Sequence, residues 1–194
     1  MTERPERRKP WGLRLRGRVF GADAPPPSGH GKGRKASAAD VLVAWLGAFA
    51  GIVLLATLVS TFPHMQLLVI GSFGASAVLL YASPRAPFAQ PRNLIGGHLI
   101  SALVGVACFK YLPDILVLQE GVAVATAIAL MMITRTVHPP GGATALIAVI
   151  GSEQIHSMGW GYVMPVMMGA IVLLGVALLS NNLHHWGSYP KRWD

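Results

Sequence analysis

The chain has 194 residues, of which 53% are hydrophobic and only 12% are charged, and its mean hydropathy is +0.50. A soluble domain of this size needs far more polar surface, so the composition excludes a soluble globular protein and indicates an integral membrane protein. The net charge of +8 lies mostly in residues 1–40, where ten Lys and Arg residues outnumber four Asp and Glu residues. The sole cysteine, Cys108, excludes a disulfide within the chain.

Residues 1–39 form a basic segment rich in Arg, Pro and Gly. The segment lacks the apolar core of a secretory signal, which leaves a transit peptide, a nucleic-acid or lipid-headgroup binder, and a flank of the first membrane helix. Because positive flanks usually stay on the cytoplasmic side, we expect a disordered cytoplasmic tail and no nucleic-acid partner. The membrane domain is then expected at 40–184, and a short second cytoplasmic tail at 185–194.

The first predicted span is 41–62, about 22 apolar residues, which is long enough to cross a bilayer. A second, shorter element is expected at 66–82. Its segment Gly71-Ser72-Phe73-Gly74-Ala75-Ser76 holds two glycines and two serines, so we expect the helix to be bent or broken there. A rigid basic loop follows at 83–92, and the third span is expected at 93–112.

The fourth predicted span ends at Thr134 and begins at 121 or, in a longer version, near 115. The segment Val137-His138-Pro139-Pro140-Gly141-Gly142-Ala143-Thr144 comes next. Two consecutive prolines interrupt a helix but suit a helix start, so a fifth element is expected at 139–150. Its length of about 18 Å is less than the roughly 30 Å of a hydrocarbon layer. A loop at 151–156 then precedes the sixth element, 160–183.

The distribution of Lys and Arg predicts the orientation of these elements. Six crossings from a cytoplasmic N-terminus place the basic residues Arg85, Arg92, Arg135, Lys191 and Arg192 inside. The acidic loop residues Asp114, Glu120 and Glu153 then lie outside, with Lys110 the one basic residue near them. The competing model has four spans, with one or both short elements re-entrant. With six crossings we expect a bacterial inner-membrane protein with both termini in the cytoplasm.

An internal similarity favours six elements. The segment Gly74–Leu80 resembles Gly142–Ala148, and each is the middle member of a trio of long, short and long elements. Three crossings per trio give the halves opposite orientations, as in many secondary transporters. Small residues that serve close helix packing are the alternative explanation. The expected fold is therefore an all-α membrane protein of about six transmembrane elements, four long spans and two short, broken or half-helices, arranged as an inverted repeat of three plus three.

The segment His138–Leu146 matches the motif that names the HPP family of integral membrane proteins. The segments Gly71–Ala77 and Gln90–His98 resemble that family's other shared blocks, so the resemblance covers about residues 40–183. The family is usually described with four spans, which differs from the six elements expected above. Its members are regarded as transporters, and plastid and cyanobacterial relatives are linked to nitrite transport. The resemblance therefore implies a transporter or channel for a small inorganic anion, with nitrite as the leading candidate.

The residues themselves suggest how an anion is held. A helix start with bare amides binds anions, so we predict that 71–76 and 138–144 meet near the membrane midplane as two opposed helix starts. His138 can contact the anion or carry a proton. These side chains can also have purely structural roles. The histidine can bond a carbonyl, the arginine can extend to the lipid headgroups, and the hydroxyls can bond carbonyls of their own helix. The predicted substrate-binding residues are Gly71, Ser72, Phe73, Gly74, Ser76, Arg92, Asn93, His98, Arg135, His138, Pro139, Pro140, Gly141, Gly142 and Thr144.

Two other function classes remain open. A histidine-based membrane redox enzyme lacks support, because no HExxH, CxxC, nucleophile elbow or paired intramembrane carboxylates occur. We therefore expect no enzyme activity, no cofactor and no metal. A regulatory or structural membrane subunit without transport activity is the second alternative. The expected partners are a small inorganic anion, the lipid bilayer and further copies of the chain, because short elements need shielding from lipid.

Overall fold

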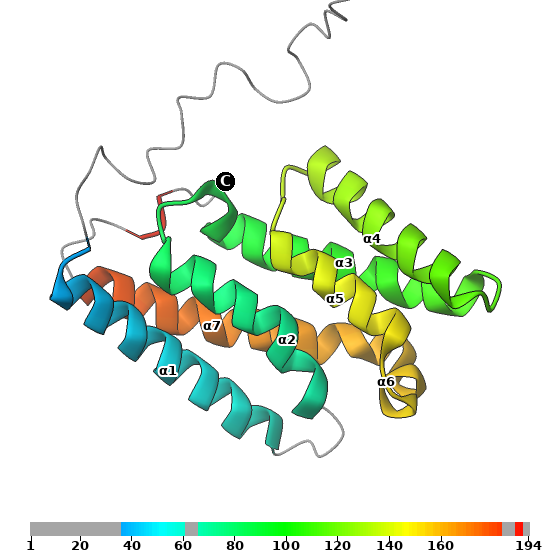
Figure 1. Ribbon diagram of the computed structural model, residues 1–194, viewed down its shortest axis with the longest axis horizontal. Coiled ribbons are helices and arrows are strands. Elements are labelled where there is room, and N and C mark those ends of the chain that lie inside the picture. The colour runs from blue at the N-terminus through cyan, green and yellow to red at the C-terminus, as the bar shows by residue number, and fades with distance from the viewer. Residues whose placement is uncertain (1–35, 61–65, 184–188, 192–194) are drawn as a thin grey trace, which may run out of the picture.

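The computed structural model describes residues 36–60, 66–183 and 189–191, which form helices joined by short connections and contain no strand. Figure 1 shows the arrangement of the helices. The long helices are α1 (Ala38–Ser60), α3 (Pro91–Tyr111), α4 (Leu116–Ile133) and α7 (Val163–Leu183). Among the described residues, four stretches are long and apolar enough to cross a membrane, and the last of them begins ahead of α7 at Glu153. The expected all-helical membrane fold with four long spans is confirmed.

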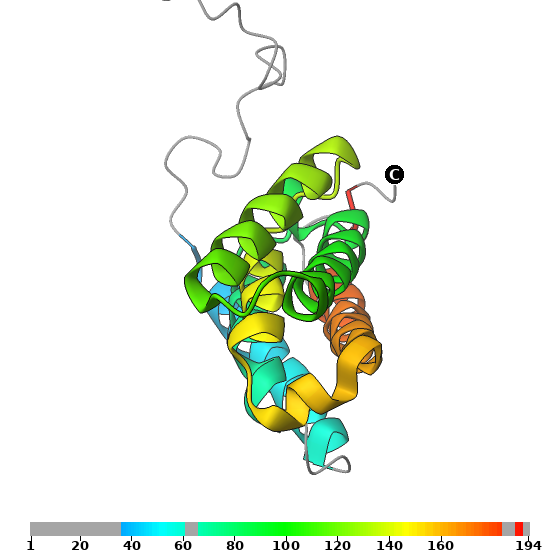
Figure 2. The same ribbon diagram turned by 90° about the vertical axis from the view of Figure 1, so that its right-hand side faces the viewer.

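Two helices of intermediate length lie among the long ones in the described part of the chain. Helix α2 (Gln66–Ala77) continues into the π-helical turn η1 (Val78–Ala82), and α5 spans Pro139–Ile150 as expected. In the end-on view of Figure 2, α3 and α7 lie on one side, and α2 and α5 lie across from them. The long helices α1 and α4 flank the pair of α2 and α5, because α1 packs on α2 and α4 packs on α5.

Consecutive membrane elements run in opposite directions in Figure 1. At one end the hydroxyl of Tyr189 donates to the carbonyl of Ala89 at 2.8 Å, and burial raises the pKa of that hydroxyl. At the other end the rings of Phe109 and His156 stack with their centroids 3.7 Å apart. The connection at 83–90, which includes the 3-10 turn η2 (Pro87–Ala89), therefore lies opposite the connection at 151–162.

The predicted break at 71–76 is wrong, because α2 stays α-helical through this segment. The Phe73 ring of this segment packs where a Cβ on Gly169 of α7 would come within 2.5 Å, whereas a Cβ on Gly71 or Gly74 would meet at most one atom, at 3.8 Å. The irregular turn comes later, in η1, where the carbonyl of Leu80 accepts a bond from the Asn181 side-chain amide at 3.0 Å. Tertiary contacts thus override the weak helix propensity of the small residues.

The predicted loop at 151–156 is also partly wrong. It contains the short helix α6 (Glu153–Met158), followed by the 3-10 turn η3 (Gly159–Tyr162), before α7 begins. Glu153 lies in the first turn of α6, where an acidic side chain complements the helix dipole. The amide of Ile155 also donates to the carbonyl of Ser152 at 2.8 Å. These local bonds order a segment that its polar composition marked as a loop.

Helix α3 lies between two buried clusters. One cluster joins it to α2 and α7 around Phe73, Leu94 and Leu173, and the other joins it to α4 and α5 around Ala127 and Val149. Because lipid is as apolar as these side chains, close packing of small residues holds membrane helices together. The residues 1–35 and 184–188, which carry most of the predicted basic tail and the start of the second tail, lie outside the described residues.

Candidate functional site

Four polar side chains from three helices meet in the middle of the bundle with no exposed surface. Ser76 belongs to α2, His98 to α3, and His138 and Thr144 to the start and second turn of α5. The Oγ of Ser76 lies 2.9 Å from Nε2 of His98 and 2.9 Å from Nε2 of His138. The Oγ1 of Thr144 lies 2.8 Å from Nδ1 of His98. We call these four residues the hydroxyl–imidazole network.

Glycines on α3 bring the two imidazoles together. A Cβ on Gly97 would lie 2.5 Å from Cβ of His138, and a Cβ on Gly96 would lie 2.5 Å from Cγ2 of Thr136. Only glycine permits this approach of the segment 136–138 to the helix. As a result the rings of His98 and His138 lie with their centroids 4.9 Å apart.

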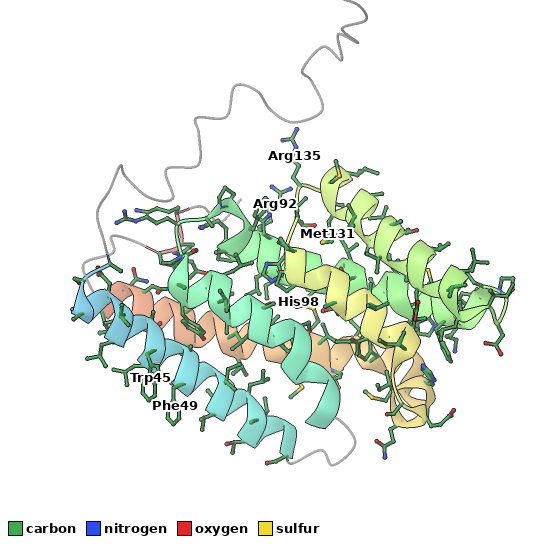
Figure 3. All side chains as sticks on the ribbon, in the orientation of Figure 1. Trp45, Phe49, Arg92, His98, Met131 and Arg135 are labelled. Carbon is green, nitrogen blue, oxygen red and sulfur yellow. The ribbon has the colours of Figure 1, made fainter. Side chains whose placement is uncertain are left out.

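Two predicted site residues at the start of α3 fix the same segment. The Nη2 of Arg92 donates to the carbonyl of Thr134 at 2.9 Å, and Nδ2 of Asn93 donates to the carbonyl of Val137 at 2.7 Å. Both side chains therefore act on the backbone that leads into α5 and make no bond to the network. Figure 3 shows Arg135 pointing away from the bundle and His98 within it. Arg135 is exposed and has a φ of 58°, which forms the turn after α4.

One carbonyl sets the direction of every hydrogen bond in the network. The Nδ1 of His138 lies 2.8 Å from the carbonyl oxygen of Phe88, which only accepts, so Nδ1 carries the hydrogen. With both histidines neutral, Nε2 of His138 must accept from the Ser76 hydroxyl, and Nε2–H of His98 must donate to Ser76. The Thr144 hydroxyl then donates to Nδ1 of His98. This assignment leaves none of the four side chains unpaired.

The predicted pair of opposed helix starts is wrong. The segment 71–76 lies inside α2 and so has no free amides. At the start of α5, Pro139 and Pro140 have no N–H, and the amide of Gly141 donates to the carbonyl of His138 at 2.8 Å. The expected row of free amides is absent there, because the two prolines that start the helix have no N–H to donate.

The remaining predicted residues divide between the two faces of the short helices. Ser72 and Phe73 are buried, and the Phe73 ring lies against His98 with centroids 4.7 Å apart. Gly141 is packed so that a Cβ would lie 2.7 Å from Oγ of Ser101. The other three glycines have room, since a Cβ on each meets at most one atom, 3.8 Å or more away; they are Gly71, Gly74 and Gly142.

Sequence reasoning missed three groups that hydrogen-bond to the network or to the helices that carry it. The carbonyl of Phe88 has no side-chain signal in the sequence. The hydroxyl of Tyr162 donates to the carbonyl of Thr144 at 3.0 Å, and Asn181 bonds the π-helical turn as described above. A polar residue within an apolar span, such as Asn181, was the available signal. The described residues contain no group of three or more His, Cys, Asp or Glu side chains that could hold a metal ion.

Comparison with known proteins gives a consistent assignment. Residues 33–190 match the family model described as HPP, transmembrane region. One curated transmembrane protein of Dictyostelium discoideum is 43% identical over 155 residues, which cover 77% of this chain and 54% of that protein. A second, from the same organism, is 41% identical over 155 residues, which cover 77% and 50%. The chain spans about half the length of these relatives, and no solved structure matches it.

Proposed function

The chain belongs to the HPP family of integral membrane proteins, and from this premise we propose that it carries a small inorganic anion across the bilayer, with nitrite as the leading candidate. The hydroxyl–imidazole network is the observation that carries the proposal. Ionisable side chains are costly inside a membrane and mark substrate pathways or proton relays by default. Two buried imidazoles and two buried hydroxyls from three helices are more than the packing of an apolar bundle requires.

The network offers hydrogen-bond donors rather than a fixed positive charge. The hydroxyls of Ser76 and Thr144 and the Nε2–H of His98 converge within bonding distance, with Nε2 of His138 among them as an acceptor. An anion that replaces the Ser76–His138 bond accepts from the Ser76 hydroxyl, and it also accepts from Nε2 of His138 when that nitrogen is protonated. The positive end of the α5 dipole adds roughly half a charge at His138. Binding by neutral donors stays weak enough for release on the other side.

Helix packing supports an inverted repeat as the basis of alternating access. Helix α1 packs on α7, and α4 packs on α3 in the corresponding way. Ser76 and Thr144 occupy the same position in the similar segments around Gly74 and Gly142, and they bond the two different nitrogens of His98. Because the network is fully buried, the anion reaches it when one trio of helices rocks against the other.

Flux measurements on purified protein in liposomes test this function. We expect uptake of nitrite or of another anion in a panel of small inorganic anions. Gly142→Leu is expected to insert and fold, because a Cβ there meets only Cγ1 of Val124 at 4.0 Å, but to lose flux by blocking the first turns of α5. Gly121→Leu on α4, where a Cβ meets nothing within 4 Å, is the matched control.

Normal flux through Gly142→Leu would show that the anion does not pass the start of α5. Absence of flux for every anion, with folded wild-type protein, would instead favour a regulatory or structural membrane subunit.

Orientation is part of the proposal, with both termini and the Arg85 loop in the cytoplasm of a bacterial cell. The positive-inside rule supports it, because Arg85, Arg92 and Arg135 share one end of the bundle. In a Cys108→Ala background, single cysteines at Ala86 and Ser152 are expected to react with an impermeant thiol reagent from opposite sides. Labelling of both from the same side would contradict the six-crossing arrangement.

We also propose that the protein associates with copies of itself. The outer faces of α2 and α5 are exposed at Gly71, Ala75 and Ile150, and short helices need shielding from lipid. Light scattering of the detergent-solubilised protein checks this, and a mass of one chain would contradict it.

A further inference from the structure

The hydroxyl–imidazole network is bonded so that it can take up a proton without leaving a polar atom unpaired. Each hydroxyl has a second acceptor, which is the carbonyl four residues earlier in its own helix. The Oγ of Ser76 lies 3.2 Å from the carbonyl of Ser72, and Oγ1 of Thr144 lies 3.4 Å from the carbonyl of Pro140. Such bonds are a standard alternative for helical Ser and Thr. Each hydroxyl can therefore turn to its carbonyl and accept a bond from an imidazole.

Protonation of His98 requires the rotation of one of these hydroxyls. When Nδ1 of His98 gains a proton, the new N–H points at Oγ1 of Thr144, and the Thr144 hydroxyl turns to the carbonyl of Pro140. The Nε2–H of His98 still donates to Ser76, and the Ser76 hydroxyl still donates to Nε2 of His138. Every donor retains an acceptor, so the imidazolium forms inside the bundle without an unsatisfied hydrogen bond.

The charge can then move to His138 through Ser76. The Nε2 proton of His98 passes to Oγ of Ser76 as the hydroxyl proton of Ser76 passes to Nε2 of His138. One O–H bond forms and one breaks, so Ser76 stays neutral. His98 is left neutral with its proton on Nδ1, and its Nε2 accepts from Ser76. His138 becomes the imidazolium, with its Nδ1–H still on the carbonyl of Phe88.

The surroundings supply no fixed counter-charge for this proton. Helices α2, α5 and α7 contain no Asp, Glu, Lys or Arg residue. None of the hydrogen bonds given above for the two imidazoles involves a charged side chain. The ionisable side chains on the elements packed around them are Arg92, Cys108, Lys110 and Tyr111 on α3, Glu120 near the start of α4, and the phenols Tyr81 and Tyr162, which donate to carbonyls.

We propose that the protein moves one proton together with each monovalent anion, and that the network is the site that binds and relays this proton. The proposal rests on the transport function proposed above and names its coupling. The anion supplies the counter-charge that the helices lack, and the proton supplies the positive charge that the neutral donors lack. Loading both makes the transported pair electrically neutral.

Uptake of nitrite into liposomes at a membrane voltage set by a potassium ionophore tests the coupling. We expect uptake that is independent of voltage, is driven by an inward proton gradient, and acidifies the lumen by one proton per nitrite. Protein-free liposomes are subtracted, because nitrous acid crosses bilayers unaided. Uptake that follows voltage and ignores the proton gradient would overturn the coupling but leave the transport function standing. Absence of uptake for every anion would overturn the transport function itself.

Variants of the hydroxyls test the relay. Thr144→Val keeps the side-chain shape but removes the acceptor for a protonated His98, so we expect about a ten-fold loss of proton-driven uptake, the equivalent of one hydrogen bond. Thr144→Ser should retain it, and Ser76→Ala should lose it. The control is Ser101→Ala. Ser101 also has a buried hydroxyl, but it lies on α3, 3.9 Å from the sulfur of Met131.

Equal proton-driven uptake by Thr144→Val and the wild type would contradict a role for the network in coupling. If Thr144→Val fails to fold, Ser76→Ala takes its place, and proton-driven uptake equal to that of the wild type would again contradict the relay.

Discussion

Replacing His98 with Leu is expected to lower nitrite uptake by about 100-fold while the protein still folds and inserts. His98 makes two hydrogen bonds to hydroxyls, and bonds to a group that becomes charged are worth about 1.5 kcal/mol each. A loss of about 3 kcal/mol corresponds to roughly two orders of magnitude in rate. Folding is expected to survive, because Ser76 and Thr144 can turn to the carbonyls of Ser72 and Pro140.

Uptake by liposomes and elution of the detergent-solubilised protein as a single species measure the two effects. His156→Leu is the matched control, because His156 is partly buried at the other end of the bundle and bonds the carbonyl of Val149. If His98→Leu folds and transports as fast as the control, the network has no part in transport.

Gly105→Ala is expected to have the largest effect on stability, a loss of about 3 kcal/mol. The added Cβ would lie 2.5 Å from the carbonyl oxygen of Ala145 and 2.7 Å from Cβ of Ala148. The oxygen belongs to the backbone of α5, so relief requires α3 and α5 to separate. Because α3 carries His98 and α5 carries Thr144, the same change also increases the distance between these two side chains.

Gly175→Ala on α7 is the matched control, because its Cβ meets nothing within 4 Å. It is expected to leave stability unchanged or to raise it by up to about 1 kcal/mol through helix propensity. Thermal loss of the monodisperse protein measures both variants. Equal midpoints for Gly105→Ala and Gly175→Ala would show that α3 and α5 are less tightly packed than described.

The sequence was sufficient to predict the long helices and the bounds of α5. Apolar runs of about 20 residues have few alternatives in a membrane, and the pair Pro139-Pro140 permits a helix to start but not to continue. It was insufficient for α2, because propensity measured without tertiary contacts marks Gly71–Ser76 as weak. In the fold, the Phe73 ring of α2 packs into the space left by Gly169 of α7, and this contact holds the segment as a helix in spite of its weak propensity.

The site was predicted as a set of residues but not as an arrangement. Ser76, His98, His138 and Thr144 were each singled out, yet 62 positions separate Ser76 from His138, and no local pattern reveals that they touch. The carbonyl of Phe88, which sets the tautomer of His138, is invisible in a sequence because every residue has one. Arg92 and Asn93 were predicted to bind substrate, whereas the structure shows their bonds to the backbone at Thr134 and Val137.

The measurement that tests the central role of the network most directly is the ¹⁵N spectrum of histidine-labelled protein in lipid, with and without sodium nitrite. Substitution of each histidine assigns the signals of His98, His138 and His156. Without nitrite, we expect neutral rings protonated at Nε2 in His98 and at Nδ1 in His138. With nitrite, both rings should shift and one should become an imidazolium, while His156 stays unchanged. Unchanged signals of His98 and His138 at nitrite concentrations that saturate uptake would contradict the account.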